Sequence, residues 1–277
     1  MMKSFKMALC QMDVVDNKEK NILKAVEMLE KAAAGGAAVA VLPEMFNCPY
    51  DNGKFNEYAE TLPDSQTAKA IAQKAKALGI YVVAGSIPER EDTKLYNTSL
   101  VFNREGEMIG KHRKMHLFDI DVKGKIRFME SEVLSSGKDI TLVETEFGRF
   151  GIAICYDIRF PELSRVMALE GAEVIIIPGA FNMVTGPAHW ELLIRGRALD
   201  NQVYVAAASP DRSMTASYTA YGNSMVASPW GSILGRACEK EEIIFADIDA
   251  EELERVRREL PLLKHRRADL YEVSKKS

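Results

Sequence analysis

The fold is decided by the stretch RFGIAICYDIRFPEL, residues 149–163, in which a strand pattern leads directly into a helix pattern. Its first half is an apolar run of the kind that forms buried strands, and Pro161 stands where the first turn of a helix accepts proline. Between the two elements lies Cys155, followed at once by Asp157 and Arg159. A cysteine that only fills a core needs no such neighbours, so they indicate a functional thiol.

Strand and helix patterns alternate along most of the chain. Apolar runs such as AVAVLP and AEVIIIPGAF are typical of buried strands. A turn signal at Asn103–Gly106 joins two β-like runs into a hairpin, so we predict mixed rather than purely parallel sheets. No repeat or low-complexity linker divides the chain, which predicts an α/β arrangement with helices outside paired sheets. Helices are predicted at 17–36, 65–79, 161–171, 187–201 and 250–260.

Composition excludes several classes of function. The 277 residues are 47% hydrophobic and carry a formal net charge of −4, which suits a large core and argues against a nucleic-acid-binding surface. No apolar run is long enough to span a bilayer, and the first residues lack the apolar region of a secretory signal. The four cysteines are scattered without a C-x-x-C pair, so we predict free thiols in a reducing cytoplasm.

Three residues of complementary chemistry stand at predicted strand ends, where ligand sites of α/β sheets gather. Cys155 lies near the amino end of the following helix, whose dipole favours a thiolate. Glu44 directly follows AVAVLP, where loss of hydration raises the pKa of a carboxyl toward that of a useful base. Lys114 lies in the basic segment GKHRKMHLFD, and we expect its ammonium to lower the pKa of the thiol and hold an oxyanion.

The neighbours of these residues have competing interpretations. If the basic segment is extended, His112, Lys114 and His116 share one side of it. The two histidines could bind a metal, but no third ligand stands at a supporting spacing, so no metal site is predicted. The remaining cysteines are interpreted as bystanders, with one of them near the candidate site in sequence: Cys10, Cys48 and Cys238.

A thiol, a carboxylate and an ammonium together suit acyl transfer. Glu44 would take the proton of Cys155, and the thiolate would attack an amide carbon while Lys114 and a backbone N–H stabilise the anion. Ammonia leaves with a proton from Glu44, and water then hydrolyses the thioester. None of the four histidines has the context of a cysteine–histidine pair.

Around these residues the sequence resembles the nitrilase superfamily of carbon–nitrogen hydrolases over nearly its whole length. The three hallmark segments are AVLPEMF, HRKMHLFD and GIAICYDIRFPE, which contain Glu44, Lys114 and Cys155. The resemblance implies one domain over 1–277, built as a four-layer α-β-β-α sandwich with mixed sheets. It also implies that Glu130 helps orient the lysine and the substrate amide, and that the N–H of Tyr156 shares the oxyanion.

Within the superfamily the sequence is similar to the omega-amidase branch, most clearly in the stretches 111–126, 178–193 and 197–210. That branch hydrolyses the terminal amide of 2-oxoglutaramate and 2-oxosuccinamate. The branch acting on deaminated glutathione typically has Glu-Thr-Gln-Cys-Tyr where this chain has DNQVY at 200–204. The alternatives are that amidase, a carbamoyl-amine hydrolase, a true nitrilase and a catalytically silent scaffold. With no G-x-G-x-x-G or Walker sequence, no cofactor is expected.

A small amide carrying a carboxylate needs a cation beyond the catalytic centre. Arg159 is the candidate, although an ion pair with Glu162 would make it structural. Weaker candidates for the pocket wall are aromatic or apolar: Tyr50, Phe118, Phe181, Met183 and Trp190. The resemblance implies a homodimer or higher homo-oligomer with the tail, about 261–277, at the subunit interface. Three charged residues of the 187–201 helix are interpreted as structural or interface residues: Arg195, Arg197 and Asp200.

Overall fold

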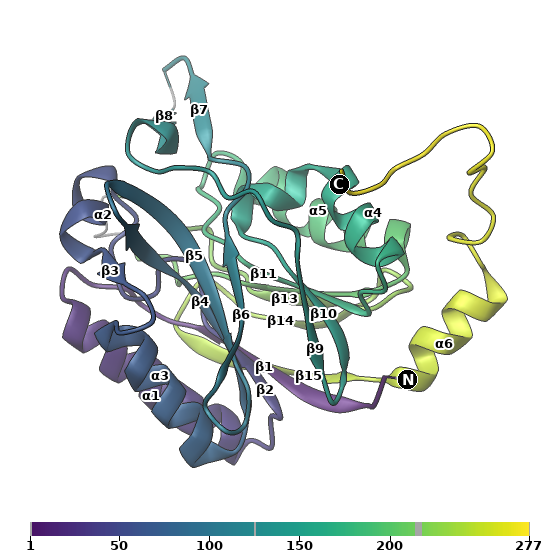
Figure 1. The fold of residues 1–277 in the computed structure, drawn as a ribbon, viewed down its shortest axis with the longest axis horizontal. Coiled ribbons are helices and arrows are strands. Elements are labelled where there is room, and N and C mark those ends of the chain that lie inside the picture. The colour runs from purple at the N-terminus through teal and green to yellow at the C-terminus, as the bar shows by residue number, and fades with distance from the viewer. Residues whose placement is uncertain (1, 125, 214–217, 277) are drawn as a thin grey trace.

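A computed structural model describes residues 2–124, 126–213 and 218–276, and these form four layers. Two sheets pack face to face, with helices on the outer face of each (Figure 1). The first sheet contains, in spatial order, β15 (Glu242–Ile248), β1 (Phe5–Gln11), β2 (Val39–Val41), β4 (Tyr81–Glu91), β5 (Lys94–Phe102) and β6 (Met108–Arg113), with β3 (Glu60–Thr61) beside β4. The second contains β14 (Ile233–Arg236), β13 (Met225–Ala227), β12 (Tyr204–Ala208), β11 (Val174–Pro178), β10 (Gly148–Ile152) and β9 (Thr141–Thr145).

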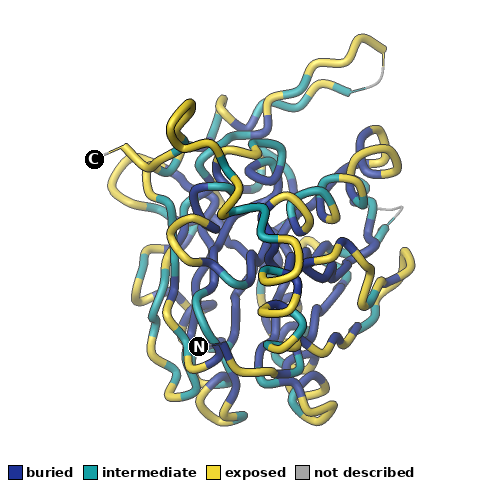
Figure 2. Tube along the Cα trace, turned by 90° about the vertical axis from the view of Figure 1, so that its right-hand side faces the viewer, coloured by how far each residue is buried: buried dark blue, intermediate teal, exposed yellow. Residues whose placement is uncertain are grey.

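The main core lies between the sheets, where the inward side chains of both interdigitate; Leu9, Val41, Ile152 and Ile176 are among its fully buried members. Helices α1 (Lys18–Ala34) and α3 (Gln66–Leu78) cover the first sheet, and α4 (Pro161–Leu169) and α5 (Gly186–Asn201) cover the second. Figure 2 shows the buried centre between exposed outer turns. The predicted α-β-β-α sandwich with mixed sheets is therefore confirmed.

Local signals set the helix ends largely as the sequence predicts. The side chain of Asn17 accepts a hydrogen bond from the N–H of Lys20 and caps α1, and Ser65 does the same for Ala68 in α3. Helix α5 begins at Gly186, one residue before the predicted Pro187. After β14 of the second sheet the chain returns to the first sheet as β15, and helix α6 (Ala250–Glu259) follows that strand.

Several elements were not predicted, and two of them lie near the site described below. Helix α2 (Asn52–Tyr58) follows the loop after β2, and the hairpin of β7 (Asp119–Val122) and β8 (Ile126–Met129) projects from the top of the sandwich in Figure 1. The hairpin strands have only four residues each and none of these residues is buried, so their sequence carries little strand signal. Their position nevertheless matters, because the chain turns inward directly after β8.

Strand direction brings three distant segments together. Strands β2 and β6 run the same way in the first sheet, because β2 is parallel to β4 and two antiparallel pairings lead from β4 to β6. Glu44 and Lys114 therefore follow strands that end at the same edge. Gly85 keeps the backbone of β4 against the turn before Glu44, since a Cβ there would lie 1.9 Å from the carbonyl oxygen of Pro43. Strand β10 brings Cys155 to this edge from the second sheet.

Candidate active site

A fully buried ammonium shared by two carboxylates forms the centre of the site. Lys114 Nζ lies 2.9 Å from Glu44 Oε1 and 2.9 Å from Glu130 Oε1, and all three side chains are excluded from solvent. Burial disfavours the charged form of the lysine, but Glu130 and Glu44 outweigh it and raise the pKa of Lys114. The ammonium therefore stays charged inside the protein.

Glu44 is held from four sides. Its Oε1 also accepts a hydrogen bond from Asn97 Nδ2 at 2.8 Å and a long one from the Tyr50 hydroxyl at 3.5 Å. Its Oε2 accepts from the backbone N–H of Ala180 at 2.7 Å. The carboxylate is thus fixed between the two sheets, since Asn97 belongs to the first and Ala180 follows β11 of the second. Sequence reasoning missed Asn97, whose only signal is a polar residue inside a buried strand.

Glu130 is buried as fully as Glu44, so it is not a solvent-facing loop residue. The hairpin places it at the start of the short 3-10 turn Glu130–Glu132. Its Oε1 accepts from the Tyr50 hydroxyl at 2.6 Å, and its Oε2 accepts from the N–H of Phe118 at 2.6 Å. Burial, opposed by Lys114, raises the pKa of Glu130.

Cys155 opens the 3-10 turn η2 (Cys155–Arg159) in a left-handed conformation, with φ 46°. Burial and the negative charge of Glu44 raise the pKa of the thiol well above its usual range, and Lys114 only partly opposes them. The predicted effect of Lys114, which lowers the pKa of the thiol, is present but is outweighed by burial and by the charge of Glu44. The raised pKa favours the protonated thiol, and the hydrogen bond between this thiol and Glu44 places a base beside its proton.

A small pocket opens beside the thiol. It is lined by Phe118, Cys155, Tyr156, Arg159, Ala180, Phe181, Thr185 and Tyr218. The Arg159 guanidinium lies 4.5 Å from the centre of the Phe181 ring and 5.6 Å from that of Tyr156. Its Nη1 contacts Nδ1 of His189 at 3.1 Å, and burial lowers the pKa of the guanidinium. Within the described ranges, Arg159 forms no salt bridge, so the pair with Glu162 is absent.

A third buried carboxylate lies behind the thiol. Asp157 is fully buried and bonds to His112 Nε2 at 3.2 Å and His116 Nδ1 at 2.7 Å. The prediction that His112, Lys114 and His116 share one side fits this arrangement, since all three side chains turn into the same end of the sandwich. Over residues 2–124, 126–213 and 218–276, no group of three metal-ligating side chains is arranged around a common point.

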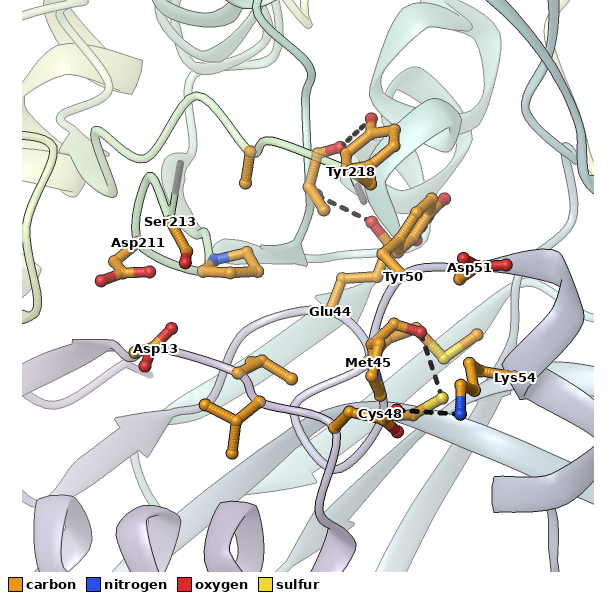
Figure 3. A pocket seen from close by; sticks show the side chains of 17 residues that line it. Asp13, Glu44, Met45, Cys48, Tyr50, Asp51, Lys54, Asp211, Ser213 and Tyr218 are labelled. Atoms are coloured by element: carbon orange, nitrogen blue, oxygen red, sulfur yellow. Dashed lines mark hydrogen bonds and ion pairs between the residues drawn. The ribbon is translucent and has the colours of Figure 1, made fainter. Parts of the chain in front are cut away.

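A larger cavity of about 430 Å³ borders the other side of Glu44, Tyr50 and Tyr218. Figure 3 shows Asp13 and Asp211 on one wall and Asp51 with Lys54 on the other. Burial, together with the negative charges of Asp13 and Glu241, raises the pKa of Asp211 to about 6. This cavity also holds Cys48, which is fully buried, and its pKa is raised by burial. Both facts leave Cys48 an inert thiol.

The remaining predicted residues differ in their placement. Met183 is 41% exposed and does not line the pocket beside Cys155. Trp190 lies in the core, where its Nε1 donates to the carbonyl of Asn223 at 2.7 Å and its ring packs against Phe181. Tyr50 lies among the buried charges rather than on the wall of the pocket beside Cys155.

An α-β-β-α sandwich with a buried thiol, ammonium and two carboxylates at one end defines the class of amide-cleaving cysteine hydrolases. The chain belongs to the carbon–nitrogen hydrolase family, whose model matches residues 6–258. It is 52% identical to omega-amidase NIT2 of Danio rerio over 99% of this chain and 98% of that one. It is 50% identical to omega-amidase NIT2 of Bos taurus over 99% of both chains.

Solved structures agree with this family. The crystal structure of Saccharomyces cerevisiae Nit3, a member of branch 10 of the nitrilase superfamily, superposes with a TM-score of 0.88 and 42% identity. The match covers 96% of this chain and 97% of that one. The fold and the order of its segments are thus those of the superfamily.

Proposed function

We propose that this protein is an omega-amidase that hydrolyses the terminal amide of 2-oxoglutaramate or 2-oxosuccinamate to the 2-oxo acid and ammonia. Full-length similarity to relatives named omega-amidase supports the activity. The observation that carries the substrate class is Arg159, a cation without a carboxylate partner among the described residues, in the same pocket as Cys155. One catalytic domain over 1–277 is part of the proposal.

The first half of the reaction acylates Cys155. Glu44 takes the proton of the thiol as the sulfur attacks the amide carbon, and the carbonyl π electrons move to oxygen. The Lys114 ammonium and the N–H of Tyr156 stabilise this oxyanion. When the intermediate collapses, the C–N bond breaks and the nitrogen takes the proton from Glu44, so ammonia leaves and a thioester remains.

The second half restores the enzyme. Glu44 removes a proton from water as its oxygen attacks the thioester carbon, and the same donors hold the second oxyanion. Collapse breaks the C–S bond, and the departing sulfur recovers the proton from Glu44. Glu130 contributes by holding Lys114, whose ammonium must face the reacting oxygen rather than rotate among its acceptors. No cofactor enters any step.

Arg159 is assigned to the far carboxylate of the substrate. Its guanidinium is desolvated and lies over the Phe181 ring, so an incoming carboxylate would meet a cation in a weakly hydrated pocket. Nη1 of Arg159 donates a hydrogen bond to Nδ1 of His189, and Nε of Arg159 has no partner among the described residues.

One ammonia-release experiment tests the proposal. Purified protein is assayed with 2-oxoglutaramate, 2-oxosuccinamate, deaminated glutathione, glutamine, a carbamoyl amine and a simple nitrile. We expect the two 2-oxo amides to have the highest kcat/KM. Preferred turnover of deaminated glutathione or of the carbamoyl amine would replace the omega-amidase proposal.

The role of Arg159 is tested with the same assay. Arg159→Met should raise KM for 2-oxoglutaramate about 10- to 100-fold and leave KM for a neutral amide nearly unchanged. Arg257 is a matched control, because it is also desolvated but donates to the main-chain carbonyls of Gln202 and Ala172. Equal effects on charged and neutral amides would make Arg159 a structural residue.

We further infer a homodimer or higher homo-oligomer in a reducing cytoplasm. Helix α5 exposes Leu192 (71%) and Leu199, and the exposed Trp230 (53%) precedes Gly231, which lies near the Leu199 side chain. The tail beyond Pro261 is largely exposed, with Leu270 at 70%, and such apolar surface is typical of interfaces. All four cysteines are unpaired, which supports the compartment. Sedimentation of wild type and Leu192→Asp tests the assembly: a monomeric wild type would contradict it.

Among the described residues, no helix combines the length and apolar character that a bilayer crossing requires.

A further inference from the structure

Asp157 receives hydrogen bonds from two separate parts of the chain. From its own turn, the N–H of Ile154 donates to Oδ2 at 2.9 Å. From the segment after β6, His116 donates to Oδ1 through its backbone N–H at 2.9 Å and through Nδ1 at 2.7 Å. His112 adds a fourth contact through Nε2 at 3.2 Å. An ionised carboxylate accepts only, so both histidines donate to it.

These hydrogen bonds lie on either side, in sequence, of the two groups whose relative position the reaction requires, the Cys155 thiol and the Lys114 ammonium. Ile154 and Asp157 enclose Cys155 in the first sequence segment, and His112 and His116 enclose Lys114 in the second. Asp157 is therefore a direct link between the turn of the thiol and the segment of the ammonium. Its side chain forms no hydrogen bond with Lys114, and Asp157 itself is not among the residues that line the substrate pocket.

The turn that carries Cys155 needs such a link. A non-glycine residue at φ 46° lies in the left-handed region and costs free energy unless its surroundings hold it there. The bond from the Ile154 N–H to Asp157 closes the turn immediately around Cys155. His116 is fixed in turn by stacking on Phe160, with ring centres 3.7 Å apart. His116 is thus held between Asp157 and Phe160.

We propose that Asp157 is a positioning residue, which with His112 and His116 fixes the Cys155 sulfur relative to the Lys114 ammonium. The inference rests on the proposed role of Cys155 as nucleophile. Loss of the Asp157 hydrogen bonds should lower kcat rather than raise KM. Misplacing a nucleophile by about 1 Å costs about 10²-fold in rate, and it does not alter how the substrate carboxylate binds. Both ionised Asp157 and its donors are required, since an amide would present an N–H to the N–H of Ile154 or to a ring N–H.

The test measures kcat and KM of Asp157→Asn with 2-oxoglutaramate, together with the rate at which iodoacetamide labels Cys155 by intact mass. We expect kcat and the labelling rate each to fall about 10²-fold while KM changes less than threefold. Glu89→Gln is the matched control. Glu89 is an equally buried carboxylate of β4 that bonds to Arg113 and Thr98 and has no contact with the Cys155 turn. Its variant should lower Tm and keep kcat.

A second pair of variants keeps the test decisive if Asp157→Asn does not fold. The His116 side chain is 30% exposed, so its replacement disturbs the core less. His116→Asn retains a side-chain donor and should keep kcat within threefold, whereas His116→Ala should lose about tenfold. Equal kcat in the two His116 variants, or a folded Asp157→Asn with wild-type kcat, would overturn the inference. Absent ammonia release by wild type would instead refute the proposed function.

Discussion

Arg113 and Lys114 are neighbours in sequence, and each binds two carboxylates, yet they serve different ends. Arg113 contacts Glu89 through two parallel bonds of 2.7 Å and also holds Glu91 on the surface of the first sheet. It stacks 3.9 Å from the centre of the Tyr96 ring. Lys114 points the other way, into the sandwich, where Glu44 and Glu130 share its charge. The arginine cluster has every group paired, whereas the lysine cluster meets a thiol and a pocket.

Buried charge alone therefore does not mark a functional site. Planar guanidinium and carboxylate groups satisfy one another and leave nothing for a ligand. An ammonium is a point charge with three donors, so one of them can turn to an oxygen that forms during a reaction. What separates the two clusters is the Cys155 thiol and its pocket, which lie beside the lysine cluster only.

Removing the thiol should make the lysine cluster as inert as the arginine cluster. Cys155→Ala is expected to abolish ammonia release from 2-oxoglutaramate, by at least about 10⁴-fold, because no other group can carry the acyl intermediate. The fold should be kept, since the change removes one small atom. Measured turnover in a variant with wild-type Tm would remove Cys155 as nucleophile.

Removing the base should cost nearly as much. Glu44→Gln is expected to lower kcat about 10²- to 10⁴-fold, since the raised pKa of the thiol leaves it protonated without a general base. Deacylation needs the same carboxylate, so the variant should accumulate a thioester at Cys155, visible by intact mass. Label on Cys10, Cys48 or Cys238 in its place would move the site. Glu91→Gln in the arginine cluster is the control and should keep full activity.

Exchanging the cations separates the two clusters directly. Lys114→Arg should lower kcat about 10²-fold, because the larger guanidinium pairs with both carboxylates and no longer faces the oxyanion. Arg113→Lys should keep kcat but lower Tm by about 2–4 °C, the effect of roughly 1 kcal/mol in a chain of this size. Kinetics and calorimetry on both variants check the contrast. A large loss of kcat in Arg113→Lys would mean that the clusters are coupled.

The pH dependence of stability should also differ between the clusters, by a smaller amount. Although burial acts against it, bonds from Arg113 and Thr98 lower the pKa of Glu89, so its stabilisation is present above the unfolded value of 4.5 and is lost as pH falls below it. The pKa of Glu130 is raised, so its ionised form costs stability from pH 4.5 upward. Relative to wild type, Glu89→Gln should therefore be least stable at pH 7 and recover toward pH 4.

Glu130→Gln should show the opposite trend, being most favourable relative to wild type at pH 7. Thermal unfolding of the three proteins between pH 4 and pH 8 measures both. Parallel curves for the two variants would contradict the assignment of opposite shifts.

The sequence predicts the fold and the three central residues because both depend on short-range signals. Glu44, Lys114 and Cys155 each follow a strand pattern, and the order of strands carries them to one edge. Glu130 depends on how an exposed hairpin folds back, which no local pattern reveals. The net direction of the pKa shift of the thiol could not be predicted for a related reason. Burial and then the charge of Glu44 raise this pKa and outweigh the Lys114 ammonium, and all three effects depend on the three-dimensional arrangement.

One consequence follows from the way β6 is built. Alternate side chains of a strand face opposite sides, so the reach of Lys114 into the interior depends on the pairing of β6 with β5, which shifts at Val101 and Phe102. The loop Asn103–Glu107 fixes that pairing from the far end of the strand. A slip of this pairing by one residue would present Arg113 to the interior and Lys114 to water. The position of the ammonium in the site is therefore set in part by a turn at the far end of the strand, which carries no residue of the site.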